Sequence, residues 1–270
     1  MTSLYFLSRY RDFYEYIPIE ELYYYGKTKY QEVIIAKNSV FGTFLVLDGK
    51  LQSAEVDEYK YHEAITLPAL VVHDDPRKVL VIGNGEGSMI KYLTKFSLER
   101  IDWVDIDEEV VLLCKKYLPY SYKGEDSRVK FFAMDGLEYI KKTNEKYDII
   151  YFDLTDPSEE NPLSNVLYSI DTAAIIRERL DDDGIFVSLA YEKVNNKWRK
   201  SAEYLKNIFS IVRYYGVWIP SFGSYVIFVF ASNKYDPLEI SKEKIENKIR
   251  ELELKYYNSL NHKLMFSLIF

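Results

Sequence analysis

The sequence predicts an α/β fold in which a small antiparallel β domain precedes a doubly wound parallel sheet. The first 65 residues are rich in tyrosine and in β-favouring segments such as KYQEVIIAK and FGTFLVLDGKLQSAE. From Arg77 onward, short apolar runs alternate with helical patterns, as in a parallel sheet with helices on both faces. We therefore expect an N-terminal β domain over residues 1–65 and a Rossmann-like domain over residues 66–270.

Each domain has its own local signals. In the first, Asn38-Ser39 and Asp48-Gly49 predict tight turns between antiparallel strands. In the second we expect parallel strands near residues 78–83, 100–107, 128–135, 147–154 and 184–190, and a hairpin-like pair near 214–220 and 224–230. We expect helices ending near residue 96, beginning near 108, and lying near 137–143, 171–180 and 196–208.

Composition narrows the class of protein. The 270 residues carry a net charge of -7 at a pI of about 5.2, which disfavours a nucleic-acid partner because phosphates repel an acidic surface. No apolar run reaches membrane-spanning length, so we expect no membrane partner. The single cysteine, Cys114, lies in an amphipathic helical pattern and has no internal disulfide partner, which favours a buried role and a cytoplasmic location. The three histidines are scattered, so we expect no metal site.

The ends of the expected strands share a feature that points to a ligand. In doubly wound sheets, ligands bind beyond the carboxyl ends of the strands. Here those ends are the glycine turn 83–87, Asp105 with Asp107, Asp135, and Asp153. Any one acid could instead cap the next helix, as Asp107 could before EEVVLL, but the series favours a binding site.

Two of these acids suit a nucleoside. Asp105 lies about twenty residues after the glycine turn, where Rossmann-like domains place an acid against ribose hydroxyls. Asp135, in AMDGLEY, is placed to accept a hydrogen bond from an exocyclic amine such as that of adenine.

Glu86 is unusual within a glycine-rich turn. A carboxylate beside a pyrophosphate would cost free energy, so Glu86 argues against a dinucleotide. A cofactor that has an amine and a sulfonium but no carboxylate, such as decarboxylated S-adenosylmethionine, would be attracted instead. The alternative is a solvent-facing residue in the first turn of a helix, where an acid is favoured by the helix dipole.

The segment DLTDP places two carboxylates, Asp153 and Asp156, on one turn. An alkyl amine has a pKa near 10.4, so a nucleophilic amine must lose a proton before it attacks. One carboxylate can accept that proton while the other binds the remainder of the amine. Tyr61 and His62, in YKYHEAI, are placed to orient the amine, or are simply packed and hydrogen-bonded.

Taken together, these motifs resemble the polyamine aminopropyltransferase family, which includes spermidine, spermine and thermospermine synthases. The matching segments are FLVLDGKLQSAEVDEYKYHEAI, VLVIGNGEGS, WVDIDEEVV, AMDGLEYI and YDIIYFDLTDP. The resemblance implies a transfer in which an amine displaces the aminopropyl group of decarboxylated S-adenosylmethionine and 5'-methylthioadenosine leaves. It also implies homodimers or homotetramers built through the β domain.

The same resemblance assigns roles to residues. Asp153 matches the proton acceptor, Asp156 a residue that binds the acceptor amine, and Glu86 the acid that binds amino groups near the transfer site. Tyr61 and His62 match residues that line the junction between donor and acceptor. Binding of the donor nucleoside is assigned to Gln31, Gly83, Gly85, Asp105, Asp135, Gly136 and Pro162.

Several positions depart from the usual spermidine synthase pattern. The turn is GNGEG rather than GGGDG, and the spacing from Asp153 to Pro162 is closer to that of thermospermine synthases. Phe222 stands where many spermidine synthases have a tyrosine, and Glu159 and Glu160 add charge to the loop. These differences favour spermidine or another long amine as acceptor.

Three alternatives remain open at this point. The first is a spermidine synthase that uses putrescine. The second is an S-adenosylmethionine-dependent methyltransferase, which would need room for a carboxylate near Glu86. The third is a polyamine sensor without catalytic activity, which would leave Asp153 and Asp156 without a chemical role.

Overall fold

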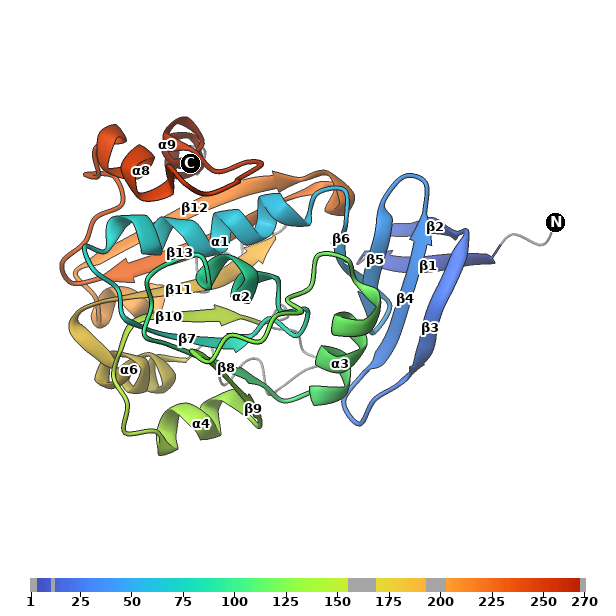
Figure 1. Cartoon of the computed structure of the whole chain (residues 1–270), viewed down its shortest axis with the longest axis horizontal. Helices are drawn as coiled ribbons and strands as arrows, with labels where there is room; N and C mark the ends of the chain where they lie inside the picture. The colour runs from blue at the N-terminus through green and yellow to red at the C-terminus, as the bar shows by residue number, and fades with distance from the viewer. Residues whose placement is uncertain (1–3, 11–12, 155–168, 193–202, 268–270) are drawn as a thin grey trace.

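The computed structural model describes residues 4–10, 13–154, 169–192 and 203–267, and their strands form three sheets (Figure 1). The N-terminal part contains a two-stranded and a four-stranded antiparallel sheet. Its strands are β1 (Leu4–Tyr10), β2 (Phe13–Ile19), β3 (Glu21–Lys27), β4 (Glu32–Asn38), β5 (Gly42–Leu47) and β6 (Lys50–Ala54). This arrangement confirms the antiparallel N-terminal unit.

Both predicted turns join strands of the four-stranded sheet. Between β4 and β5, the side chain of Asn38 accepts hydrogen bonds from the backbone of Val40 and Phe41 at 3.0 and 2.7 Å. Between β5 and β6, Asp48 and Gly49 adopt positive φ angles of 46° and 74°, as a two-residue hairpin requires.

The seven-stranded sheet has the order β12-β13-β11-β10-β7-β8-β9. Its strands are β7 (Lys78–Gly83), β8 (Arg100–Asp105), β9 (Val129–Ala133), β10 (Tyr147–Asp153), β11 (Leu180–Glu192), β12 (Ile211–Ile219) and β13 (Ser224–Ser232). Strands β7 to β11 are parallel, and β13 pairs antiparallel with both β11 and β12. The doubly wound sheet and the late hairpin are therefore both confirmed.

Helices cover both faces of this sheet (Figure 1). On one face lie α1 (Glu58–Val72), α2 (Ser88–Leu93), α8 (Lys242–Ile249) and α9 (Ser259–Ser267); on the other lie α4 (Gly136–Lys142), α6 (Ile170–Arg179) and the 3-10 helix η1 (Glu203–Asn207). The expected domain boundary at residue 65 lies inside α1, and most of the helix expected near 196–208 lies outside the described residues. None of the described helices is long and apolar enough to cross a membrane.

Helix α3 (Glu108–Tyr117) joins the two parts of the molecule. Asp107 caps it by accepting a hydrogen bond from Val110 N, which confirms the capping interpretation of that acid. Cys114 is fully buried, as predicted, in a cluster that includes Val33 and Leu45 of the four-stranded sheet. The N-terminal sheet is thus docked through α3 onto the domain that carries the strand-end acids.

The C-terminal segment packs on the body of the same chain. Met265 and Phe266 of α9 are buried, and the ring of Phe266 stacks on Tyr215 at 4.5 Å. The segment just before α9 is held by Glu63 of α1. The carboxylate of Glu63 is fully buried and accepts three backbone hydrogen bonds from this segment. Its donors are Lys255, Tyr256 and Tyr257, at 3.0, 2.9 and 2.7 Å.

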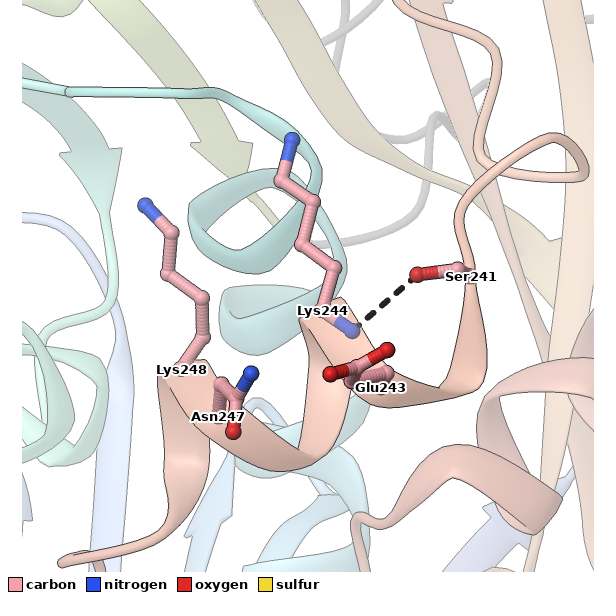
Figure 2. Close-up of a pocket in the computed structure, with 5 residues that line it drawn as sticks. All are labelled: Ser241, Glu243, Lys244, Asn247 and Lys248. Atoms are coloured by element: carbon pink, nitrogen blue, oxygen red, sulfur yellow. Dashed lines mark hydrogen bonds between the residues drawn. The ribbon is translucent and has the colours of Figure 1, made fainter.

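A surface hollow of about 430 Å³ lies along α8. It is lined by Ser241, Glu243, Lys244, Asn247 and Lys248 (Figure 2). Lys244 donates to Val72 O at 2.9 Å, and Lys248 donates to His73 O at 3.1 Å. Both lysines therefore satisfy carbonyl groups at the C-terminal end of α1, away from Tyr61 and His62. The hollow is a feature of helix packing, separate from the acids at the strand ends.

Candidate active site

The glycine turn between β7 and α2 brings two strand ends into contact. Gly83 and Gly87 have φ angles of +88° and +71°. A Cβ atom on Gly83 would lie 2.0 Å from the carbonyl oxygen of Asp153, so only glycine allows β7 and β10 to end side by side here. Asn84 also has a positive φ, 60°, and its N–H donates to that same carbonyl at 3.0 Å.

Asp153 is held by two side chains at the end of β10. Tyr61 donates to Oδ1 at 2.5 Å, and the side-chain amide of Asn84 donates to Oδ2 at 2.8 Å. Burial raises the pKa of Asp153, and the His62 charge and the Tyr61 hydrogen bond offset only part of that rise. The carboxylate is therefore fixed in direction and more basic than an ordinary aspartate.

Glu86 lies between two other elements. Ser53 of β6 donates to its Oε2, and His62 of α1 forms an ion pair with its Oε1. Glu86 thus connects the N-terminal sheet, the glycine turn and α1.

His62 is fully buried and is engaged at both ring nitrogens. Its Nδ1 donates to the carbonyl oxygen of Glu58 at 2.8 Å and to Glu58 Oε2 at 2.9 Å, while Nε2 meets Glu86. Burial alone would lower its pKa, but the Glu86 charge and the Glu58 hydrogen bond raise it to about 10. His62 is therefore an imidazolium at neutral pH, and it faces Glu86 rather than open space.

The acids after β8 form a hydrogen-bonded group with the N-terminal part. Asp105 Oδ1 accepts from Asp107 N at 2.8 Å. Asp107 Oδ2 accepts from Thr28 Oγ1 and Gln31 Nε2, at 2.6 and 2.9 Å. Burial raises the pKa of Asp105 to about 7; the Asp107 and Asp153 charges add to this rise, and the Asp107 N–H opposes it. The structure thus places Gln31 beside the two acids.

Gly85 and Gly136 let the backbone approach neighbouring groups closely. A Cβ on Gly85 would lie 3.3 Å from Asp105 Oδ2, and one on Gly136 would lie 2.2 Å from Ile82 Cγ2. Asp135 caps α4 by accepting from Glu138 N at 2.8 Å. It follows β9, which pairs with β8, so it lies at the same edge of the sheet as Asp105.

Most of the predicted residues come together at this edge. Tyr61 contacts Asp153, and His62 contacts Glu86. The charge of Glu86 contributes to the raised pKa of Asp153. Asp156 and Pro162 lie outside the described residues. Sequence reasoning missed Ser53, Asn84, Glu58 and Tyr120, which hold the predicted side chains in place.

Comparisons with known proteins match both parts of the chain. Residues 58–242 match the model of the spermine/spermidine synthase domain, and residues 6–55 match that of the spermidine synthase tetramerisation domain. The chain belongs to the spermine/spermidine synthase family. This membership confirms the resemblance found in the sequence and makes the chain a transferase of the aminopropyltransferase class.

Relatives of this family cover nearly the whole chain. Polyamine aminopropyltransferase 1 of Hyperthermus butylicus is 38% identical over 93% of this chain and 89% of its own length. A polyamine aminopropyltransferase of Methanocaldococcus jannaschii is 34% identical over 93% of this chain and 86% of its own length.

Solved structures of family members share the fold. A spermidine synthase in complex with the transition-state analogue AdoDATO superposes with a TM-score of 0.93 at 26% identity, over 100% of this chain and 93% of that one. The spermidine synthase of Thermotoga maritima gives a TM-score of 0.90 at 27% identity, over 98% and 91% of the two chains.

Proposed function

We propose that the protein transfers the aminopropyl group of decarboxylated S-adenosylmethionine to a polyamine, and that it releases 5'-methylthioadenosine. The observation that carries this proposal is the Asp153 carboxylate, held by Tyr61 and Asn84 within the electrostatic reach of Glu86. Asp153 is suited to remove a proton from an amine, and Glu86 is suited to bind a cation. The AdoDATO complex of the related spermidine synthase supports the same class of donor.

The donor is proposed to lie across the carboxyl ends of β7, β8 and β9. Asp105 would accept from the ribose hydroxyls, and Asp135 with Gly136 would bind the adenine. Gln31 would complete the nucleoside contacts, while Gly83 and Gly85 allow close approach of the backbone. Pro162 is assigned to donor binding by its match to the family sequence pattern alone. The amino group of the aminopropyl chain would face Glu86.

In the proposed reaction the acceptor nitrogen attacks the methylene carbon of the aminopropyl chain that is bonded to sulfur. The new C–N bond forms as the C–S bond breaks, and the sulfonium leaves as a neutral thioether. Asp153 accepts the proton lost by the amine, and its raised pKa favours that transfer. Asp156 would bind the distal part of the acceptor. Since the leaving group is already activated, alignment and proton removal are the main tasks of the protein.

Binding of the nucleoside is expected to depend on pH through Asp105. Ribose hydroxyls donate hydrogen bonds, so they favour the ionised carboxylate, whose pKa is raised to about 7 in the free protein. The dissociation constant of 5'-methylthioadenosine should therefore be constant above about pH 8. It should rise about tenfold per pH unit well below 7. Calorimetric titrations between pH 5.5 and 8.5 test this, and Asp105→Asn should abolish the slope. A wild-type profile that is flat would contradict the assignment.

We propose a long amine such as spermidine as the acceptor, which gives a thermospermine- or spermine-type product. Phe222 supports this, because it has no hydroxyl and stands where many spermidine synthases have a tyrosine; it is partly buried against the apolar cluster that includes α1. The test is mass spectrometry of products after incubation with the donor and putrescine, cadaverine, agmatine, norspermidine or spermidine. Faster turnover of spermidine than of putrescine is expected, and turnover of putrescine alone would contradict the proposal.

Spermidine synthesis from putrescine is the second candidate. It is favoured by both solved structures described above, which are spermidine synthases. Restoring a hydroxyl with Phe222→Tyr separates the two candidates: in an enzyme for long amines, this change should shift the ratio of kcat/KM values toward putrescine.

We also propose that the chain forms homodimers or homotetramers through its N-terminal β domain. The tetramerisation-domain match over residues 6–55 supports this, as do apolar side chains exposed on that part. Leu22, Tyr25 and Val40 are 48%, 63% and 65% exposed in the single chain. Light scattering after size-exclusion chromatography should give two or four times 31.9 kDa. A monomeric mass at micromolar concentration would contradict the proposal.

A further inference from the structure

The carboxylate of Glu86 is held by two hydroxyl groups in series. Ser53 of β6 donates to Glu86 Oε2, and the Tyr120 hydroxyl lies 2.8 Å from Ser53 Oγ. A serine hydroxyl has one hydrogen, so when Ser53 donates to Glu86 the tyrosine must be the donor to Ser53. The hydrogens therefore point from Tyr120 through Ser53 to Glu86, and each bond polarises the next.

Tyr120 is well suited to remain the donor at the start of this series. It is 6% exposed and packs in the cluster where α3 meets the N-terminal sheet. Burial and the charge of Glu86 raise the pKa of its hydroxyl well above 10, so the group keeps its proton. The backbone is tied to the glycine turn as well, because Ser88 Oγ donates to Tyr120 O at 3.4 Å.

Glu86 is therefore held from two directions. His62 contacts Oε1 from α1, and Ser53 contacts Oε2 from β6. With both oxygens held, the carboxylate cannot rotate freely, and its remaining lone pairs have a fixed direction. The cost of ordering the glutamate is met during folding rather than during binding of a ligand.

We propose that Ser53 and Tyr120 are positioning residues that aim Glu86 at the amino group of the aminopropyl donor. The inference rests on the proposed function, because it takes Glu86 as the group that binds this amine. Neither residue needs to touch the donor. Their effect should therefore be confined to ligands that have the aminopropyl chain.

The test compares two ligands by calorimetry. Decarboxylated S-adenosylmethionine has the aminopropyl group, whereas 5'-methylthioadenosine has the same nucleoside without it. For Ser53→Ala we expect the dissociation constant of the donor to rise about tenfold, the usual effect of losing a hydrogen bond to a charged group. Tyr120→Phe should raise it severalfold. Affinity for 5'-methylthioadenosine should stay within twofold of wild type for both variants.

Two control variants separate positioning from general loosening of the fold. Ser53→Thr keeps a hydroxyl on β6 and should restore most of the donor affinity. Tyr122→Phe removes a hydroxyl from the same loop, one that lies near Gly124 rather than Ser53, and should leave both affinities unchanged. Equal weakening of the two ligands by Ser53→Ala or Tyr120→Phe would overturn the inference, even if the variants remained folded.

Glu86→Gln distinguishes this inference from the function on which it rests. If Glu86→Gln weakens the donor but Ser53→Ala and Tyr120→Phe do not, the positioning role is wrong and the proposed function stands. If Glu86→Gln leaves the donor affinity unchanged, the assignment of Glu86 fails, and the positioning role fails with it.

Discussion

Asp153→Asn is expected to lower kcat by about 10²- to 10⁴-fold, the usual contribution of a positioned general base. The variant keeps an oxygen that can accept from Tyr61 but loses the basic carboxylate that Tyr61 and Asn84 hold at the end of β10. Donor binding should change little, because the residues proposed to contact the nucleoside belong to other segments of the chain. Product formation followed by mass spectrometry, together with calorimetry of the donor, separates the two effects.

The matched control is Asp148→Asn, which makes the same chemical change at the other end of the same strand. Asp148 accepts from the backbone N–H groups of Arg77 and Lys78, both at 2.7 Å, so this variant should lose stability rather than activity. Retention of more than a tenth of kcat in Asp153→Asn would contradict the assignment of Asp153 as the proton acceptor.

In the wild type, kcat should fall as the pH falls through the pKa of Asp153, since the protonated acid cannot accept the proton of the amine.

Gly83→Ala is expected to lower the free energy of unfolding by about 3 kcal/mol or more and to abolish transfer. The alanine backbone would have to adopt a φ of +88°, and its Cβ would lie 2.0 Å from the carbonyl oxygen of Asp153. Two parallel strand ends would have to separate to make room. Asn84 and Asp153 are hydrogen-bonded to each other across this junction, so the Asp153 carboxylate, the proposed proton acceptor, would move as well. Denaturant unfolding and activity assays measure the two losses.

Gly49→Ala is the control for backbone conformation alone. Gly49 has a φ of +74°, similar to that of Gly83, but a Cβ there meets no atom within 4 Å. We expect a loss of about 1 kcal/mol without loss of transfer. Similar losses in the two variants would show that the contact between strands at Gly83 has little importance.

The sequence predicted the features that depend on neighbours in the chain. Alternating apolar runs predicted the strands of the large sheet, and the position of each acid after a strand predicted that they would share one edge. The Asp48-Gly49 hairpin and the cap at Asp107 were likewise predictable, because both follow from local backbone chemistry. The extent of β11 was not predictable in this way: the strand expected near residues 184–190 spans Leu180–Glu192, because pairing with the neighbouring strands determines its length.

The supporting residues of the site were not predictable in the same way. Ser53 and Tyr120 are 67 positions apart and meet only because α3 docks on the N-terminal sheet. No local pattern marks such a pair. Asn84 did have a signal, because a non-glycine residue among turn glycines is often asparagine at a positive φ. His62 showed a different limit: the sequence placed it near the site but could not tell that both its nitrogens face other protein groups.

The three backbone hydrogen bonds to Glu63 have a mechanical consequence for α1. Tyr61, His62 and Glu63 are consecutive on one helix, so they point in directions about 100° apart. Anchoring Glu63 to residues 255–257 therefore sets the rotation of α1 about its own axis. That rotation in turn determines where the Tyr61 hydroxyl and the His62 ring point. Residues 255–257 thus set the orientation of the helix whose side chains contact Asp153 and Glu86.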